Sequence, residues 1–403
     1  MIYKNGSILK GIRVLDLSQY LSGPFCTSSL ADFGAEVILV ERPDRPKGAG
    51  PYINGERIYT LSTFRGKKSV TLNLKKEEDK EIFLKLAEAS DVIVENFKPG
   101  TMDNMGLGYE ACKKRNPGII YAAISGFGYT GPYRARGAMD VVIQAMSGIM
   151  SLTGEPDGKP TKVGPSISDI VAGLFCSIAV MGALYHKQAT GVGQFIDIAM
   201  LDCSVACMEN AVATYFATGK TPTRVGNRHQ SAAPFQNFQA ADGDIYIAVG
   251  RDTLFDILCK VLGMPELAND ERFAKADNRR LNVKELEKEI TKGTSTKTVA
   301  ELEALLCAAG IPAGRINTIE SVVNDSQIVE RGLIWPLDHP VAGTYKVAGS
   351  PIKMSETTPY NLVPCPTLGQ HTQEVLNNVL HMPQEQIKNF LEDQVKSTVK
   401  EEG

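Results

Sequence analysis

The sequence predicts an α/β fold: a Rossmann-like parallel sheet in a large domain, followed by a smaller α+β domain. In the first half, short runs rich in Val and Ile alternate with stretches of helical length. Continuous apolar runs indicate strands buried on both faces, and the helices between them indicate parallel connections. After about residue 138 the pattern becomes mostly helical. With 403 residues the chain is long enough for two or three domains, each with a sizeable core.

The expected elements of the large domain follow one another along the chain. The helix at residues 77–90 is the best defined, because apolar side chains recur at helical spacing and acidic ones fill its first turn. Further helices are expected at 23–33 and 109–114. The expected strands are 12–17, 37–41, 91–95, 118–125 and 194–199, the last one interrupting the helical stretch 138–218.

The second domain follows a polar stretch at 219–231 that contains Gly and Pro and is typical of a linker. A strand is expected at 244–249, with helices at 254–262, 284–292 and 299–309. Residues 314–319 are expected to begin the return, and the charged end, 385–403, is expected to fray. We therefore predict a large domain over 1–220, a small domain over 225–320, and a return to the large domain over 321–403.

Composition excludes several classes of protein. With 43% apolar residues the chain is not disordered, and a net charge of −3 provides no basic field for a nucleic acid. The longest apolar run, 170–185, is shorter than the ~20 residues of a membrane span and predicts a buried helix. The N-terminus has no apolar signal core, and eight cysteines without CxxC indicate reduced thiols. These features predict a cytoplasmic protein without nucleic-acid or membrane partners.

One apparent motif is a false match. Residues 126–131 fit GxGxxG and follow an expected strand, but a dinucleotide site needs a helix to begin there. Pro132 follows at once, and the sequence up to Gly137 is typical of a loop. We interpret this segment as a turn that brings backbone close to a ligand, followed by Arg134 and Arg136, which suit phosphate.

Histidine and cysteine chemistry receive little support. None of the five histidines lies in the first 185 residues, so a His-based triad or metal site near the sheet is hard to assemble. Cys203 and Cys207 are four residues apart on an expected helix with apolar neighbours, and we predict that both face the core.

Asp169 is the most informative acidic residue. It ends the loop 164–168 and precedes an apolar helix. Capping that helix is the commonest role for such a residue. A partly buried carboxylate between the small residues Ser168 and Gly173 has room for a substrate, so Asp169 is also a candidate nucleophile.

Basic residues recur near the ends of the expected strands, where ligands bind in open α/β sheets. Single lysines are usually only solvated surface, but the recurrence favours a phosphate-binding field. Its members are Arg42, Lys67, Lys68, Lys75 and Lys98.

Several ordered segments together resemble the family III CoA-transferases, and the resemblance covers essentially the whole chain. Asp169 with Gly173 four residues later is one of the family-like features. The others are residues 11–17, 23–24, 30–38, 65–70, 72–75, 95–100, 105–109, 125–132 and 190–194. Two positions depart from the family pattern: Phe64 stands where Asn is usual, and Asn104 where a longer side chain often reaches CoA.

The resemblance implies an interlocked homodimer of α/β subunits that transfers CoA from an acyl-CoA thioester to a free carboxylic acid. It makes Asp169 the nucleophile, through aspartyl-anhydride and aspartyl-CoA thioester intermediates. CoA is then a substrate, and no metal or permanently bound cofactor is implied. The implied CoA-binding residues are Gln19, Leu21, Ser22, Arg42, Leu72, Asn73, Leu74, Lys75, Asn96, Phe97, Lys98 and Arg136.

Three alternatives remain open. Racemases of the same family exchange an α-proton with a His beside the Asp that matches Asp140, but Met139 occupies that position here. A related lyase or isomerase of acyl-CoA is the second. The third is a catalytically inactive CoA-binding protein, and the intact Asp169 argues against it. The acyl group and the acceptor are not readable from the residues; we expect a small carboxylic acid or dicarboxylate.

Overall fold

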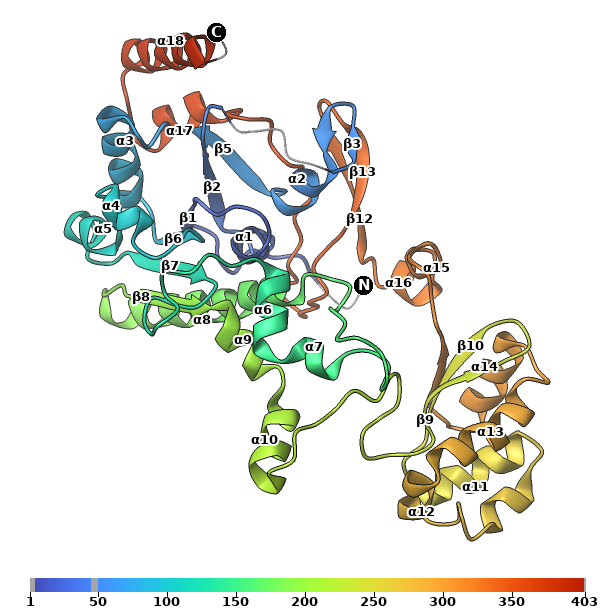
Figure 1. Ribbon diagram of the computed structural model, residues 1–403. Coiled ribbons are helices and arrows are strands. Elements are labelled where there is room, and N and C mark those ends of the chain that lie inside the picture. Colours follow the sequence, from blue (N-terminus) through green and yellow to red (C-terminus); the bar gives the residue numbers. More distant parts are fainter. Residues whose placement is uncertain (1–3, 45–49, 402–403) are drawn as a thin grey trace. The chain divides into compact units, whose positions relative to one another are not determined.

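The computed structural model describes residues 4–44 and 50–401. The chain forms two compact units (Figure 1). The first unit consists of the chain up to Ile149, Lys162–Ala213, and the chain from Val329 onward. The second consists of Met150–Thr161 and Thr214–Ile328. Residues 150–161, which the sequence analysis assigned to the large domain, thus group with the second unit.

The first unit is built on a parallel sheet of six strands in the order β5-β2-β1-β6-β7-β8. In chain order the strands occupy positions 3-2-1-4-5-6, the doubly wound arrangement in which ligands bind where the order reverses. Here that point lies between β1 and β6. The strands are β1 (Arg13–Asp16), β2 (Glu36–Glu41), β5 (Lys67–Thr71), β6 (Val92–Glu95), β7 (Ile120–Ser125) and β8 (Phe195–Ala199).

Both faces of this sheet are covered by helices, which confirms the α/β fold class. Successive residues of one strand alternate between the faces, so Val14 and Leu15 belong to different apolar clusters. One face packs against α3 (Glu77–Glu88), α4 (Thr101–Asn104), α5 (Tyr109–Arg115), α17 (Thr372–Asn378) and α18 (Gln384–Glu401). The other packs against α1 (Ser22–Asp32), α6 (Asp140–Ser147), α8 (Ile167–Thr190) and α9 (Met200–Ala206).

A close helix crossing joins α1 to α8. A Cβ atom on Gly173 would lie 2.6 Å from the carbonyl oxygen of Ser22, so only glycine permits this approach. Because Asp169 is one turn before Gly173 on α8, the crossing holds the start of α8 against the start of α1.

Strand β5 was not among the expected elements, because its first residues are Lys67 and Lys68. Lys67 is fully buried and forms an ion pair with Asp16 at 2.8 Å. Its ammonium group also lies 5.1 Å from the centre of the Phe64 ring. Lys68 is paired with Glu36 and Glu374. The prediction that Lys67 forms part of a phosphate-binding field is therefore wrong, because it is buried and Asp16 neutralises its charge. Lys68 is half-exposed.

Further elements of the first unit extend this core. Two hairpins are antiparallel: β3 (Tyr52–Ile53) with β4 (Glu56–Arg57), and β12 (Ile334–His339) with β13 (Gly343–Ala348). Helix α2 (Ile58–Thr63) contributes Leu61 to a cluster with the second hairpin. Helix α18 continues to Glu401, and Ile387 anchors its start to the core, so the expectation that residues 385–403 fray is wrong for this start.

The second unit has its own core around a three-stranded antiparallel sheet, ordered β11-β10-β9. Residues 314–319 were expected to begin the return to the large domain. They overlap strand β11 (Ala313–Arg315), which pairs with β10 (Asp244–Ala248) inside this unit, so this expectation is wrong.

The remaining strand of this sheet is β9 (Phe235–Gln239). The helices are α11 (Asp252–Val261), η1 (Pro265–Asn269), α12 (Ala276–Leu281), α13 (Val283–Thr294), α14 (Val299–Ala308) and α15 (Ile319–Val323). Three short helices lie at the unit boundaries: α7 (Ile149–Leu152), α10 (Glu209–Thr218) and α16 (Ser326–Glu330).

Two predictions of burial hold only in part. Helix α8 buries one face, including Ala172, Cys176 and Val180, while Ile178 on its other face is 66% exposed. Cys203 is buried as expected, but Cys207 is exposed because α9 ends at Ala206.

The ion pair between Asp16 and Lys67 yields a stability prediction. Replacing Lys67 by Met should destabilise the first unit by about 3–5 kcal/mol, because the buried Asp16 carboxylate then lacks its cation. Urea unfolding followed by circular dichroism measures this loss. The double variant Asp16→Asn/Lys67→Met should recover part of it, and two strictly additive losses would contradict the account.

Candidate active site

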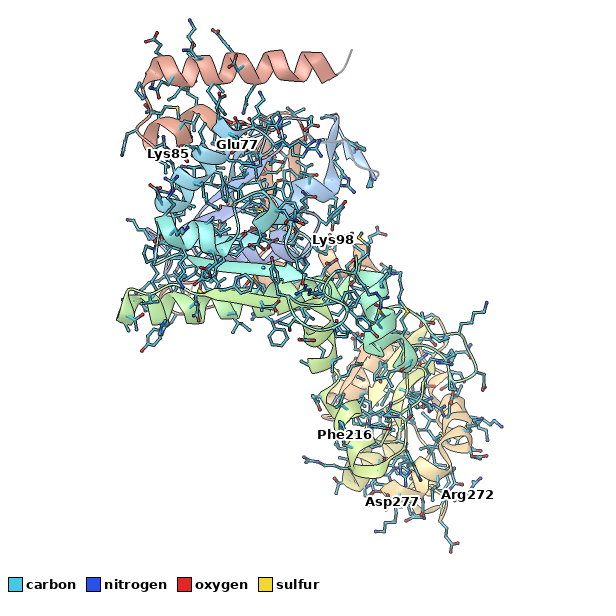
Figure 2. The ribbon with its side chains drawn as sticks, turned by 60° about the vertical axis from the view of Figure 1, so that its left-hand side comes forward. Glu77, Lys85, Lys98, Phe216, Arg272 and Asp277 are labelled. Atoms are coloured by element: carbon cyan, nitrogen blue, oxygen red, sulfur yellow. The ribbon has the colours of Figure 1, made fainter. Side chains whose placement is uncertain are left out.

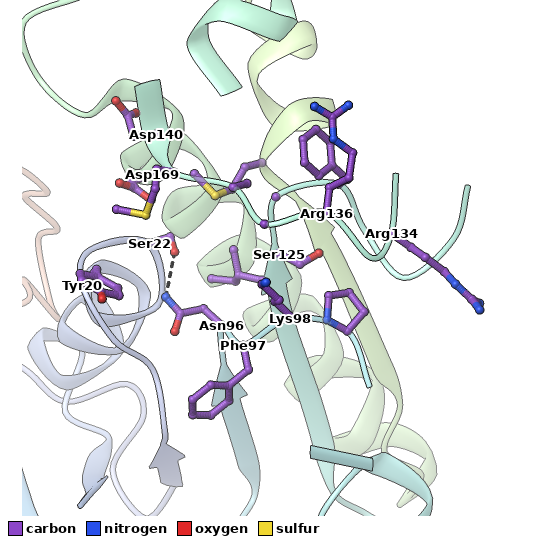
Figure 3. Close-up of a pocket in the computed structure, with 18 residues that line it drawn as sticks. Tyr20, Ser22, Asn96, Phe97, Lys98, Ser125, Arg134, Arg136, Asp140 and Asp169 are labelled. Carbon is purple, nitrogen blue, oxygen red and sulfur yellow. Dashed lines mark hydrogen bonds between the residues drawn. The ribbon is translucent and has the colours of Figure 1, made fainter. Parts of the chain in front are cut away.

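A cavity of about 160 Å³ opens where the strand order reverses, at the carboxyl ends of β1 and β6 (Figure 3). All the residues that line it belong to the first unit. They come from the loop after β1, the start of α1, the loop after β6, the end of β7 and the segment after it, and the starts of α6, α8 and α9. The lining residues are Tyr20, Ser22, Asn96, Phe97, Lys98, Pro99, Ile124, Ser125, Gly126, Phe127, Arg134, Arg136, Gly137, Ala138, Met139, Asp140, Asp169 and Met200.

Asp169 is the third residue of α8, and its carboxylate faces this cavity. The local interpretation that it caps the helix is wrong. Ser166 occupies the N-cap position, and the backbone N–H of Ser168 donates instead to Asp140 Oδ1 at 2.9 Å. Asp140 thus accepts from one N–H of the first turn of α8, and the Asp169 carboxylate faces the cavity.

Asp140 is held in this position by α6 and its surroundings. Gln144 donates from Nε2 to Asp140 Oδ2 at 2.7 Å, and accepts from the backbone N–H of Val163 at 2.9 Å. Ser204 of α9 donates to Ser168 Oγ at 3.0 Å. The start of α8 is therefore fixed by hydrogen bonds to both α6 and α9.

The surroundings of Asp169 favour its protonated form. Burial raises the pKa of Asp169 to about 7, and the charge of Asp140 adds to this effect. Burial likewise raises the pKa of Tyr59 to about 12, with contributions from the charges of Asp169 and Asp140. Tyr59 lies on α2 and was not a sequence candidate, because nothing in the pattern of residues 58–63 connects that helix to α8.

The opposite side of the cavity is basic. Lys98, Arg134 and Arg136 line it, and the Arg136 guanidinium lies 4.7 Å from the centre of the Tyr133 ring and 5.2 Å from that of Phe127. Residues 126–139 form no helix, in agreement with the rejection of the dinucleotide motif. Cations on exposed loops suit an anionic ligand such as a phosphate group.

The cavity brings together about half of the residues expected to contact CoA. Ser22, Asn96, Phe97, Lys98 and Arg136 line it together with Asp169. Gln19 and Leu21 flank Tyr20 in the loop after β1 but do not line the cavity. The five others, which are Arg42, Leu72, Asn73, Leu74 and Lys75, follow β2 and β5.

This second group contains side chains with different surroundings. Arg42 is exposed and paired with Asp44, whose pKa is lowered mainly by the hydrogen bond from Arg42 and also by the charge of Lys75. Asn73 accepts from the backbone N–H of Lys75 at 3.2 Å. Leu72 as a whole is buried in the core, and its backbone N–H donates to the carbonyl oxygen of Glu41 at 2.8 Å.

Two lining residues outside the expected set add to the site. Arg134 appeared in the sequence only as one of two arginines after the glycine-rich turn, and Asp140 only as a position matched in racemases. The spacing along the chain does not predict that either residue lies near Asp169, because both are far from position 169 in the sequence. Within the described ranges, no group of three or more His, Cys, Asp or Glu side chains could hold a metal ion.

Comparison with known proteins identifies the family. The model of CoA-transferase family III matches residues 9–372. The chain belongs to this family.

Curated relatives and a solved structure agree with that assignment. The chain is 39% identical to succinyl-CoA:glutarate CoA-transferase of Mus musculus, over 95% of this chain and 89% of that protein. It is 42% identical to acetyl-CoA:oxalate CoA-transferase of Acetobacter aceti, over 86% and 88%. The crystal structure of a CAIB/BAIF family protein from Brucella suis superposes with a TM-score of 0.84 at 38% identity, covering 93% of this chain and all of that one. The protein is therefore an enzyme of the CoA-transferase class.

The raised pKa of Asp169 predicts a pH-dependent effect on stability. Since the pKa in the folded state lies above the ordinary value of 3.8, the favourable contribution of Asp169 is present below pH 3.8 and is lost as the pH rises through about 7. Asp169→Asn should therefore be more stable than the parent protein at pH 8, by on the order of 1 kcal/mol or about 2–4 °C in Tm. Solvent screening of this half-exposed carboxylate keeps the gain at that size.

Thermal unfolding at pH 5, 6, 7 and 8 measures the difference. The advantage of Asp169→Asn should grow across this range, whereas the exposed Asp256→Asn on α11 should show none. An advantage that does not vary with pH would contradict the raised pKa.

Proposed function

We propose that this enzyme moves CoA from an acyl-CoA thioester to a free carboxylic acid, with the Asp169 carboxylate as the nucleophile. One observation carries the proposal: Asp169 faces a cavity whose opposite wall is basic, and no hydrogen bond or ion pair to its carboxylate occurs among the described residues. A carboxylate with a pKa near 7 is a better nucleophile than an ordinary one and is still ionised in part at neutral pH.

The proposed cycle balances without a proton or a redox step. Asp169 attacks the carbonyl carbon of the donor thioester, and CoA leaves as a thiolate from the acyl-aspartyl anhydride. The thiolate attacks the aspartyl carbonyl, which releases the donor carboxylate and forms an aspartyl-CoA thioester. The acceptor carboxylate displaces CoA from Asp169 to form a second anhydride. The thiolate then attacks the acceptor's carbonyl and regenerates Asp169.

Each of these attacks creates a negatively charged oxygen that needs hydrogen-bond donors. Backbone N–H groups of the glycine-rich segment 126–131 are candidates, since Gly126 lines the same cavity. Lys98, Arg134 and Arg136 supply positive charge for the phosphates of CoA. In this proposal CoA is a substrate, and the carboxylate chemistry needs no resident cofactor or metal.

We propose small dicarboxylic acids as the acceptor class, with succinyl-CoA as a donor. The support comes from the relatives, whose names specify glutarate, oxalate and mesaconate as acids and succinyl-CoA or acetyl-CoA as thioesters. A second carboxylate on the acceptor suits the basic side of the cavity.

The racemase alternative has less support. A two-base exchange of an α-proton needs a second base beside Asp169. Met139 stands next to Asp140 at the cavity, and none of the described residues that line it is a histidine.

Mass spectrometry in heavy water tests the proposal. Succinyl-CoA mixed with oxalate, glutarate, mesaconate and monocarboxylic controls should yield new CoA thioesters with the parent protein. Asp169→Ala should lower the rate by at least about 10⁴-fold, because the covalent route is lost. With succinyl-CoA alone, the intact parent protein should carry an adduct equal to CoA less one water.

Asp256→Asn is the matched control, an exposed carboxylate of the second unit that should keep full activity. Transfer that survives in Asp169→Ala would refute the nucleophile. Deuterium at the α-carbon of 2-methylacyl-CoA without any new thioester would establish the racemase instead.

We also propose that the enzyme is a cytoplasmic homodimer whose subunits interlock, and that a second copy covers the outer face of α8. Helix α8 has 24 residues and is long and apolar enough, by length and composition, to cross a membrane. Its outer face exposes Leu174, Ile178 and Tyr185, the last at 79%. Phe216 on α10, 80% exposed, is a further apolar side chain at the surface (Figure 2).

All eight cysteines are free thiols, which supports the proposed location in a reducing compartment.

Light scattering coupled to gel filtration tests the dimer. The parent protein should have twice the chain mass at micromolar concentration, and Ile178→Glu should weaken association at least tenfold, because a charge would be buried at the interface. Leu281→Glu, at a comparably exposed apolar position on α12, is the control. A monomeric parent protein, or one that sediments with lipid vesicles, would contradict the proposal.

A further inference from the structure

The carboxamide of Asn96 forms hydrogen bonds with both the backbone N–H and the carbonyl oxygen of Gln19, in the loop after β1. Gln19 donates its backbone N–H to Asn96 Oδ1 at 2.8 Å, and Asn96 Nδ2 donates to the carbonyl oxygen of Gln19 at 2.7 Å. Asn96 Nδ2 also donates to Ser22 Oγ at 3.2 Å, drawn as the dashed line in Figure 3. The polar atoms of this side chain are therefore already engaged within the protein.

These hydrogen bonds enclose a residue in an unusual conformation. Tyr20, between Gln19 and Ser22, has a φ of 61°, in the left-handed region that an aromatic residue rarely adopts. Its side chain is exposed at the edge of the cavity that contains Asp169. Residues in such conformations persist only where their surroundings fix them, and they cluster at ligand-binding sites.

The two ends of the loop contact strand β1 and helix α8. Ser18 donates its backbone N–H to the buried Asp16 carboxylate at 2.8 Å. A Cβ atom on Gly23 would lie 2.1 Å from Cβ of Ser18, and one on Gly173 would meet the carbonyl oxygen of Ser22. Both ends of the loop are thus fixed by packing. Between them, the carbonyl oxygen of Leu21 accepts from the backbone N–H of Phe25 at 2.8 Å, and Asn96 holds Gln19.

We propose that Asn96 is a positioning residue that holds the loop 19–22 in shape before any substrate binds. This assignment differs from the CoA contact that family resemblance implies for Asn96, because the carboxamide is committed to the loop. It rests on the proposed function only in its effect on catalysis: the loop forms the edge of the cavity that acyl-CoA would enter. The shape of the loop itself does not depend on that function.

Hydrogen exchange of the substrate-free protein tests the proposal directly. In Asn96→Ala, the backbone amides of residues 18–22 should exchange at least tenfold faster than in the parent protein. Asn96→Asp keeps the acceptor for the Gln19 N–H and loses the donors, so its exchange should be intermediate. Unchanged exchange in Asn96→Ala would overturn the proposal, whatever the variant's activity.

Kinetics and CoA binding separate positioning from direct contact. Asn96→Ala should lower kcat for transfer by about 10–100-fold, since small displacements of groups at a reacting centre have effects of this size. The Kd for free CoA, measured by calorimetry, should change less than threefold. A much weaker Kd with unchanged exchange would show that Asn96 binds CoA itself. If the parent protein has no transferase activity, the proposed function fails, and the exchange result still decides the role of Asn96.

Asn116 provides a matched control at the opposite end of the sheet. Its Nδ2 donates to the carbonyl oxygen of Ser90 at 2.8 Å, and its Oδ1 accepts from the backbone N–H of Gly118 at 3.0 Å. Asn116→Ala should lower the Tm without altering exchange in residues 18–22 or kcat. Equal effects of both alanine variants on that loop would reduce the role of Asn96 to general stability and refute positioning.

Discussion

The ion pair between Asp16 and Lys67 joins the end of the central strand β1 to β5, two strands away, at a position without access to water. Asp16 also accepts hydrogen bonds from Ser18 and from Thr27 of α1, the latter at 2.6 Å. Burying a charged pair is costly unless its remaining lone pairs are satisfied, and here both carboxylate oxygens are. One buried carboxylate thus fixes the edge strand, the loop after β1 and helix α1 together. The cavity at the point where the strand order reverses depends on all three.

Charge is distributed unequally around that cavity. Asp140 and Asp169 lie on one side, and Lys98, Arg134 and Arg136 contribute positive charge on the other. Burial raises the pKa of Asp169, and the charge of Asp140, which also accepts from the Ser168 N–H, adds to this effect. A raised pKa makes the Asp169 carboxylate more basic, a condition that suits a nucleophile.

Helix α8 has two distinct functions along its length. Its first turn presents Asp169, its glycine at position 173 brings α1 close, and one face packs on the sheet. The outer face leaves large apolar side chains such as Ile178 in contact with solvent in a single chain. In the proposed dimer, the second chain covers this apolar surface and stabilises the helix that carries Asp169.

The sequence by itself determined the parallel α/β sheet, most of its strands and helices, and the family, because apolar periodicity and ordered motifs are local properties of the chain. It did not reveal β5, since the burial of Lys67 depends on a carboxylate 51 positions away. Nor could it decide which residue accepts from the first turn of α8, because only the folded chain brings Asp140 to the Ser168 N–H. The engagement of Asn96 with Gln19 is likewise a contact across 77 positions. Tertiary structure decided these features because hydrogen bonds and ion pairs form between groups that are neighbours in space, whatever their separation along the chain.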